Sequence, residues 1–173
     1  GGLAHHGDLL VYGASKLASE ALINAYSAMF GLRAIIMRPA NLVGPGQTHG
    51  VGLDFIRQLV TDPKRLEVLG NGSQTKSYLW IDDAINAVLI ALRQRNEGTH
   101  IFNIASEDEI RVKDIAELAA RTMDATPIIH YGTNDRGWKG DVPRVKLLCD
   151  RIRSIGWRPR WNSWQAMQAS LEA

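Results

Sequence analysis

Residues 12–39 decide the fold of this chain, and they read YGASKLASEALINAYSAMFGLRAIIMRP. Up to Phe30 the stretch holds no proline, and its apolar residues recur at helical spacing. Gly31 is placed to end the helix, because glycine readily adopts the left-handed conformation that a helix end requires. The apolar run 33–38 then predicts a short buried strand that stops at Pro39. A helix, a glycine turn and a buried strand together indicate one unit of a parallel α/β sheet.

The helix expected over 12–30 is apolar on more than one side. Ile23, Tyr26 and Phe30 widen its apolar surface beyond the single stripe that would cover a sheet. A helix of this kind is normally buried on both sides. We therefore expect one side to cover the sheet and the other to pack on a partner helix, which a symmetric homodimer would supply.

The rest of the chain continues the alternation of strands and helices, so the fold class expected is α/β throughout. Apolar runs predict further strands over 66–69, 77–81 and 100–105. Helical spacing predicts helices over 53–60, 82–95, 112–123, 146–155 and 163–173.

Composition excludes several classes of protein. The chain has 173 residues, of which 45% are hydrophobic, so it can bury a core, and no apolar run is long enough to span a membrane. Its net charge is only +2, with basic and acidic residues interspersed, which argues against nucleic acid and favours small phosphate-bearing ligands. A single cysteine, Cys149, excludes an internal disulfide and, without a signal peptide pattern at the N-terminus, favours a cytoplasmic location.

Tyr12 and Lys16 form the first candidate for chemistry. Residues four apart on a helix point the same way, so the lysine ammonium can lie beside the phenol and stabilise its anion. One cation about 4 Å away in a partly shielded cleft supplies about 4 kcal/mol, which is enough to make a tyrosine usable as a base at neutral pH. The alternative is a tyrosine near a helix start beside a solvated lysine, because Y-x-x-x-K is a short motif.

Other polar residues have both a functional and a structural interpretation. Asn41 follows a buried strand, where open α/β sheets bind ligands, but it could equally bond its own loop backbone. Asp82 and Asp83 are expected to cap or complement a helix start rather than to form a catalytic pair. The cluster 70–72 is expected to be a hairpin turn rather than a phosphate loop. The five histidines and Cys149 lack metal-ligand spacing, so no metal site is predicted.

Taken together in order, five blocks of sequence resemble the extended short-chain dehydrogenase/reductase superfamily. Within it they are most similar to the NAD-dependent nucleotide-sugar epimerases and dehydratases. The blocks are YGASK at 12–16, RPAN at 38–41 with GPG at 44–46, GNGSQTKSY at 70–78 with the aspartates at 82–83, FNIA at 102–105, and GDVP at 140–143 with GWRP at 156–159. Two further stretches, GV at 50–51 with DFI at 54–56 and RGW at 136–138, are most similar to archaeal-type UDP-glucose 4-epimerases.

The resemblance implies a division of the chain. Residues 1–45 would be the C-terminal remnant of a Rossmann-like NAD-binding domain, and residues 46–173 the smaller nucleotide-sugar-binding domain, with strand 100–105 joining the Rossmann sheet. The family places a glycine-rich dinucleotide loop and a catalytic serine or threonine well before the tyrosine, and only eleven residues precede Tyr12 here. We therefore expect a C-terminal piece, or a protein that works with a separate N-terminal half.

The resemblance also implies roles for individual residues. Tyr12 would be the catalytic acid and base, Lys16 its electrostatic partner and a ligand of the nicotinamide ribose, and the backbone at Pro39 and Ala40 part of the nicotinamide pocket. The residues implied at the substrate are Asn41 at the sugar diphosphate, Lys76 and Arg136 at the phosphates, Asp141 at the nucleotide ribose, and the backbone of Glu67 and Leu69 at the uracil.

The activity implied is NAD-dependent epimerisation of a UDP-sugar at C4 through a 4-keto intermediate, carried out by a homodimer. Two alternatives stay open at this point. One is a nucleotide-sugar 4,6-dehydratase or decarboxylase of the same superfamily. The other is a nucleotide-sugar-binding fragment without turnover.

Overall fold

The computed structural model describes residues 11–94, 96–137 and 144–173. Helix α1 (Val11–Phe30) ends at Gly31, whose φ of 65° is the left-handed conformation expected there. Strand β1 (Ala34–Pro39) follows and pairs in parallel with β6 (Thr99–Ile104). The αβ unit predicted from residues 12–39 is therefore confirmed.

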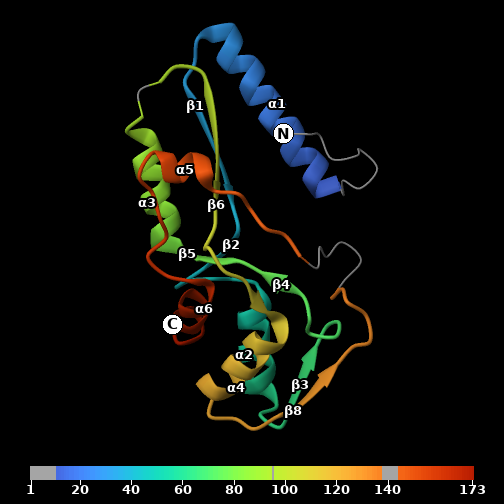
Figure 1. Ribbon diagram of the computed structural model, residues 1–173. Coiled ribbons are helices and arrows are strands. Elements are labelled where there is room, and N and C mark those ends of the chain that lie inside the picture. The colour runs from blue at the N-terminus through green and yellow to red at the C-terminus, as the bar shows by residue number, and fades with distance from the viewer. Residues whose placement is uncertain (1–10, 95, 138–143) are drawn as a thin grey trace.

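The β1–β6 pair carries helices on both sides. Figure 1 shows α1 on one side, and α3 (Ile81–Leu92) with α5 (Asp150–Ser154) on the other. The core of this region lies between the strands and the α3 side, where residues such as Phe102, Ile104 and Trp157 are buried. This layering of helices on a parallel strand pair is the α/β arrangement that the sequence predicts.

The remaining described strands form three further pairs. Strand β2 (Asn41–Val43) is parallel to β5 (Tyr78–Trp80), β3 (Arg65–Val68) is parallel to β8 (Ile128–Tyr131), and β4 (Thr75–Lys76) is antiparallel to β7 (Ile110–Arg111). A second core joins β3 to the helices α2 (Val51–Thr61), α4 (Val112–Thr122) and α6 (Ser163–Leu171). We call α2, α4 and α6 with β3 and β8 the three-helix lobe (Figure 1).

Within this chain helix α1 is covered on one side only, so the expected packing of its other side on a second copy stays a prediction. Only Ser27 is buried in α1, and the side chains of Tyr12 and Met29 are both 74% exposed. The reason is that β1 and β6 are the strands α1 contacts, and they cover only its inner side. No other described element lies on the outer side of α1 (Figure 1).

Three local predictions are corrected in part. Asp82 and Asp83 both lie in the first turn of α3, as expected, but neither caps the helix. Asp83 is also buried, and its carboxylate accepts from the backbone N–H groups of Arg160 and Trp161 at 3.0 and 3.2 Å. The cluster 70–72 is a turn but not a hairpin, because β3 and β4 on either side of it pair with other strands. The predicted helix over 146–155 is shorter, since α5 covers only Asp150–Ser154. None of the helices in the described ranges has the length and apolar character needed to cross a bilayer.

Candidate active site

Tyr12 and Lys16 lie side by side on the first turns of α1. The Lys16 ammonium is 5.3 Å from the centre of the Tyr12 ring, and both side chains are exposed. The Ser15 hydroxyl between them donates to the Tyr12 carbonyl at 2.8 Å, inside the helix. The helix alone thus assembles this pair, because residues four apart share a face.

An ion pair connects α1 to the carboxyl end of β1. Arg38 donates from Nε to one oxygen of Glu20 at 2.7 Å, and its terminal nitrogen pairs with the other oxygen. The bond from Arg38 lowers the pKa of the Glu20 carboxyl, although burial opposes the shift. Arg38 belongs to the strand that leads to the candidate nicotinamide pocket, so this pair links α1 to that strand end.

The backbone at Pro39 and Ala40 lies at the carboxyl end of β1, as expected. The Ala40 N–H donates to the Ile104 carbonyl at 2.8 Å, and proline has no N–H. Of the polar backbone groups of these two residues, only the carbonyls are therefore left for a ligand. Parallel strands present such ends to the ligands of open α/β sheets.

Asn41 begins β2 and does not bond its own loop. Its side-chain amide donates to the Ser77 carbonyl at 3.2 Å, across the β2–β5 pair. This bond uses one of the two N–H groups of the amide, and the residue is exposed. Asn41 therefore offers an oriented donor and acceptor beside the end of β1.

The structure brings the loop of Arg136 against the turn 70–72. A Cβ added at Gly70 would lie 2.9 Å from the Arg136 carbonyl, and the Gly132 N–H donates to the Gly70 carbonyl at 2.8 Å.

Lys76, in β4, is half-buried opposite Ile110. Asp141 lies outside the described residues, so its predicted contact with the nucleotide ribose stays a prediction.

Two glutamines, which sequence reasoning missed, bind the backbone groups of Glu67 and Leu69 that are expected to contact the uracil. Gln58 on α2 accepts from the Glu67 N–H at 2.8 Å and donates to the Glu67 carbonyl at 3.2 Å. Gln74 donates to the Leu69 carbonyl at 3.2 Å, and its own Oε1 is buried without a partner among the described residues. A uracil that accepted from the Glu67 N–H would have to displace Gln58, whereas the Glu67 carbonyl keeps a second lone pair. No spacing in the sequence signals this contact, because it depends on α2 lying against β3.

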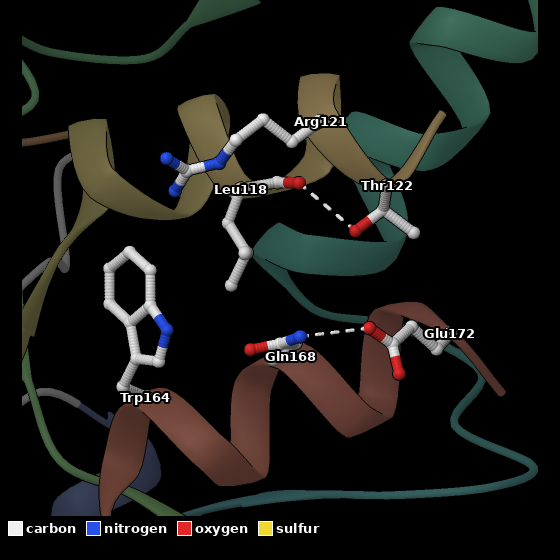
Figure 2. Close-up of a pocket in the computed structure, with 6 residues that line it drawn as sticks. All are labelled: Leu118, Arg121, Thr122, Trp164, Gln168 and Glu172. Atoms are coloured by element: carbon white, nitrogen blue, oxygen red, sulfur yellow. Dashed lines mark hydrogen bonds between the residues drawn. The ribbon is translucent and has the colours of Figure 1, made fainter. Parts of the chain in front are cut away.

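A groove with a cavity volume of about 300 Å³ lies elsewhere, between α4 and α6. Figure 2 shows Arg121 reaching over Trp164, 5.6 Å from the ring centre, with Gln168 bonded to Glu172 at 3.0 Å. None of the candidate residues lines it. The described residues also contain no group of three His, Cys, Asp or Glu side chains that could hold a metal. Cys149 is buried, and burial raises the pKa of its thiol.

Comparison with known proteins assigns the chain to a family. A family model described as the NAD dependent epimerase/dehydratase family matches residues 6–105, so the chain is a member of that family. The chain is 29% identical over 163 residues to the dTDP-L-rhamnose 4-epimerase of Burkholderia thailandensis, a match that covers 88% of this chain and 42% of the relative. It is 28% identical over 152 residues to the putative UDP-glucose 4-epimerase of Methanocaldococcus jannaschii, covering 86% of this chain and 48% of the relative.

Solved structures agree with this assignment. A UDP-galactose 4-epimerase superposes with a TM-score of 0.85 at 36% identity, over 94% of this chain and 52% of that one. The UDP-glucose 4-epimerase of Thermus thermophilus, solved with NAD, has a TM-score of 0.77 at 22% identity, over 93% of this chain and 52% of that one, and shows the shared fold. This chain thus spans about half the length of the relatives that it matches. The family resemblance and the Rossmann-like α/β fold class are confirmed.

Proposed function

We propose that this chain is the acid–base and substrate-binding part of an NAD-dependent epimerase that inverts C4 of a UDP-sugar. The observation that carries the proposal is the Tyr12–Lys16 pair, whose ammonium lies 5.3 Å from the phenol ring on an exposed helix start. The similarity to a UDP-galactose 4-epimerase, at 36% identity over 94% of this chain, supports an epimerase.

The described residues fit the nicotinamide end of NAD. Tyr12 and Lys16 present a hydroxyl and an ammonium on one face of α1, and Pro39 and Ala40 offer carbonyls at the end of β1. These four residues would hold the nicotinamide and its ribose. When bound, NAD supplies a hydride acceptor and donor for the sugar carbon. Because the relatives are about twice as long, we propose that the pyrophosphate is held by a part of such a protein that this chain does not span.

Tyr12 would move the proton of the reaction. As a phenolate it takes the proton of the sugar 4-hydroxyl while C4 loses its hydride, which leaves a 4-keto sugar. After the sugar turns over, Tyr12 returns the proton to the oxygen as C4 regains the hydride on its other face. Lys16 would stabilise the phenolate between these two steps, because an adjacent cation favours the charged form.

The substrate would lie along the ends of β2, β3 and β4. Lys76 and Arg136 would bind the diphosphate, because charge-assisted bonds to phosphate are stronger than neutral ones. Asn41 would contact the sugar diphosphate through the amide groups that Ser77 leaves available. Asp141 would reach the nucleotide ribose, and the backbone of Glu67 and Leu69 the uracil.

The outer surface of α1 would pack on a second copy. Ile23, Tyr26 and Phe30 are each at least 40% exposed, and burial of such a surface supports association. A homodimer related by a two-fold axis would place α1 against its own counterpart. We also propose a cytoplasmic location, in keeping with the single cysteine.

A second reaction is favoured by some relatives. The trifunctional UDP-glucose 4,6-dehydratase/epimerase/reductase RHM3 of Arabidopsis thaliana is 29% identical over 163 residues, covering 93% of this chain and 24% of that protein. A dehydratase or decarboxylase would use the same tyrosine to form the 4-keto sugar but would then eliminate or lose a group. The two reactions therefore differ in their products.

Product analysis by NMR tests the proposal. A full-length protein that contains this chain, supplied with NAD and UDP-glucose, should form UDP-galactose. Formation of a 4-keto-6-deoxy sugar would replace the epimerase by a dehydratase, and absence of any product would leave a nucleotide-sugar-binding protein. The 173-residue chain alone should bind UDP in a calorimetric titration but should neither bind NAD tightly nor turn over substrate.

A further inference from the structure

One peptide unit of β5 is held from both ends by side chains. The Ser77 carbonyl accepts from the Asn41 amide at 3.2 Å, and the N–H of Tyr78 donates to the Ser163 hydroxyl at 3.0 Å. These two groups belong to the same planar peptide bond, in which the carbonyl and the N–H point in opposite directions. A rotation of that plane would therefore move the acceptor that holds Asn41.

Ser163 is itself fixed at the start of α6. It is 0% exposed, its N–H donates to the Asp108 carboxylate at 2.7 Å, and its hydroxyl donates to the Asp108 carbonyl at 3.0 Å. The hydroxyl thus donates once and accepts once. Helix α6 packs directly on β5 and β2 (Figure 1). The result is a continuous series of hydrogen bonds from Asn41 through the β5 peptide and Ser163 to Asp108.

Two further contacts keep Ser163 in register with β5. The Ser106 hydroxyl donates to the Tyr78 carbonyl at 2.7 Å, and so holds the next peptide unit. The buried carboxylate of Asp83 accepts from the N–H groups of Arg160 and Trp161, just before α6. The start of α6 is therefore positioned by α3 and cannot slide along β5 without breaking buried hydrogen bonds.

We propose that Ser163 is a positioning residue for Asn41, and through it for the sugar nucleotide. The inference rests on the proposed function in so far as Asn41 contacts that substrate. Hydrogen bonds in series polarise one another, so acceptance by Ser163 strengthens the carbonyl end that binds Asn41. The bond to Ser77 fixes one N–H of the Asn41 amide and so fixes its rotamer. The Oδ1 atom and the second N–H stay available to a ligand, and binding then costs less side-chain entropy.

The test compares two serine substitutions on α6 in the 173-residue chain. Ser163→Ala removes the acceptor of Tyr78, whereas Ser170→Ala removes a hydroxyl that bonds Gln47 at 3.1 Å, away from β5. Nitrogen-15 NMR should show that Ser163→Ala shifts the Asn41 side-chain amide and the Tyr78 amide resonances, and that Ser170→Ala shifts neither. Where Ser163→Ala fails to fold, Ser163→Cys keeps the size with a weaker acceptor and should shift them in the same direction.

Calorimetric titration with UDP-glucose supplies the functional readout. Ser163→Ala should weaken binding about 3- to 10-fold, the effect of one neutral hydrogen bond, and should have no further effect in an Asn41→Ala background. An equal loss in both backgrounds, or an Asn41 resonance that stays at its parent position, would overturn the proposal. If the parent chain does not bind UDP-glucose, the proposed function fails, while the NMR comparison still decides whether Ser163 positions Asn41.

Discussion

The region around α1 and the three-helix lobe bury their apolar residues to very different extents. In the lobe, Phe55, Leu59, Leu66 and Met167 are at most 3% exposed and pack in one cluster. In α1 the apolar side chains are largely exposed. The contrast teaches that the candidate substrate-binding region holds its own core, whereas the candidate catalytic pair lies on the least packed helix. Its placement in an active protein therefore depends on surfaces beyond those that α1 contacts here.

The largest effect on turnover should come from a substitution in α1, although α1 buries few of its side chains. In a full-length protein, Tyr12→Phe should lower turnover about 10²- to 10⁴-fold with little change in KM, because it removes a positioned acid and base but keeps the ring. Tyr26→Phe, on the same helix, is the matched control and should leave turnover unchanged. Steady-state kinetics with UDP-glucose measure both, and an unchanged kcat in the Tyr12 variant would remove it from this role.

The free energy of unfolding should depend on the three-helix lobe far more than on α1. Leu66→Ala, at a fully buried position in β3, should lower the free energy of unfolding of this chain by about 2–5 kcal/mol. Met29→Ala on α1 should change it by less than about 0.5 kcal/mol, because the side chain is already in water. Urea unfolding followed by tryptophan fluorescence compares the two. Similar losses for both variants would show that α1 is packed in solution, contrary to the structure.

The candidate phosphate contacts, which lie outside α1, should determine the affinity for UDP. Lys76→Ala and Arg136→Ala should each weaken UDP binding about 10-fold or more, because each removes a charge-assisted bond. Raised salt should weaken binding by the parent as well. Arg121→Ala, in the separate groove between α4 and α6, serves as the control and should bind UDP like the parent. Parent-like affinity in both test variants would refute the diphosphate assignment.

The smallest effect should be a loosening of α1 in acid. Arg38 lowers the pKa of Glu20 in the folded chain, so this contribution to stability is present above the ordinary glutamate value of 4.5 and is lost as the pH falls through the lowered value. Below that value, the amides of α1 should exchange faster with deuterium while those of α4 do not. Glu20→Gln should abolish this pH dependence. Acid-induced exchange that is equal in α1 and α4 would indicate global unfolding instead.

Local patterns predicted much of the fold and part of the site. The helix over 12–30, its end at Gly31 and the strand after it follow from spacing and from one glycine, so they needed no distant partner. The Tyr12–Lys16 pair forms for the same reason. What covers the outer side of α1 did not follow from such patterns, because a count of apolar residues says which surface should be covered but not what covers it.

Long-range contacts lay beyond local reasoning. Asp83 is a helix-start acid, as the sequence indicates, but nothing near it in the sequence shows that its carboxylate binds the N–H of Arg160, a residue 77 positions away. Gln58 binds the backbone of Glu67 because α2 lies against β3, and neither residue carries a recognisable motif. Each contact joins a side chain to the backbone of another segment, and such a hydrogen bond produces no periodic pattern in the sequence.

By itself, the sequence determined the α/β class, the family and the adjacency of Tyr12 and Lys16, since these depend on residues a few positions apart and on blocks in a fixed order. Only the tertiary structure decided how Asn41 is held. Its anchor is a β5 peptide whose N–H reaches Ser163, 85 residues further along the chain, and that meeting exists only once α6 packs on β5. A hydrogen bond of this kind follows from the packing of whole elements, which no single stretch of sequence specifies.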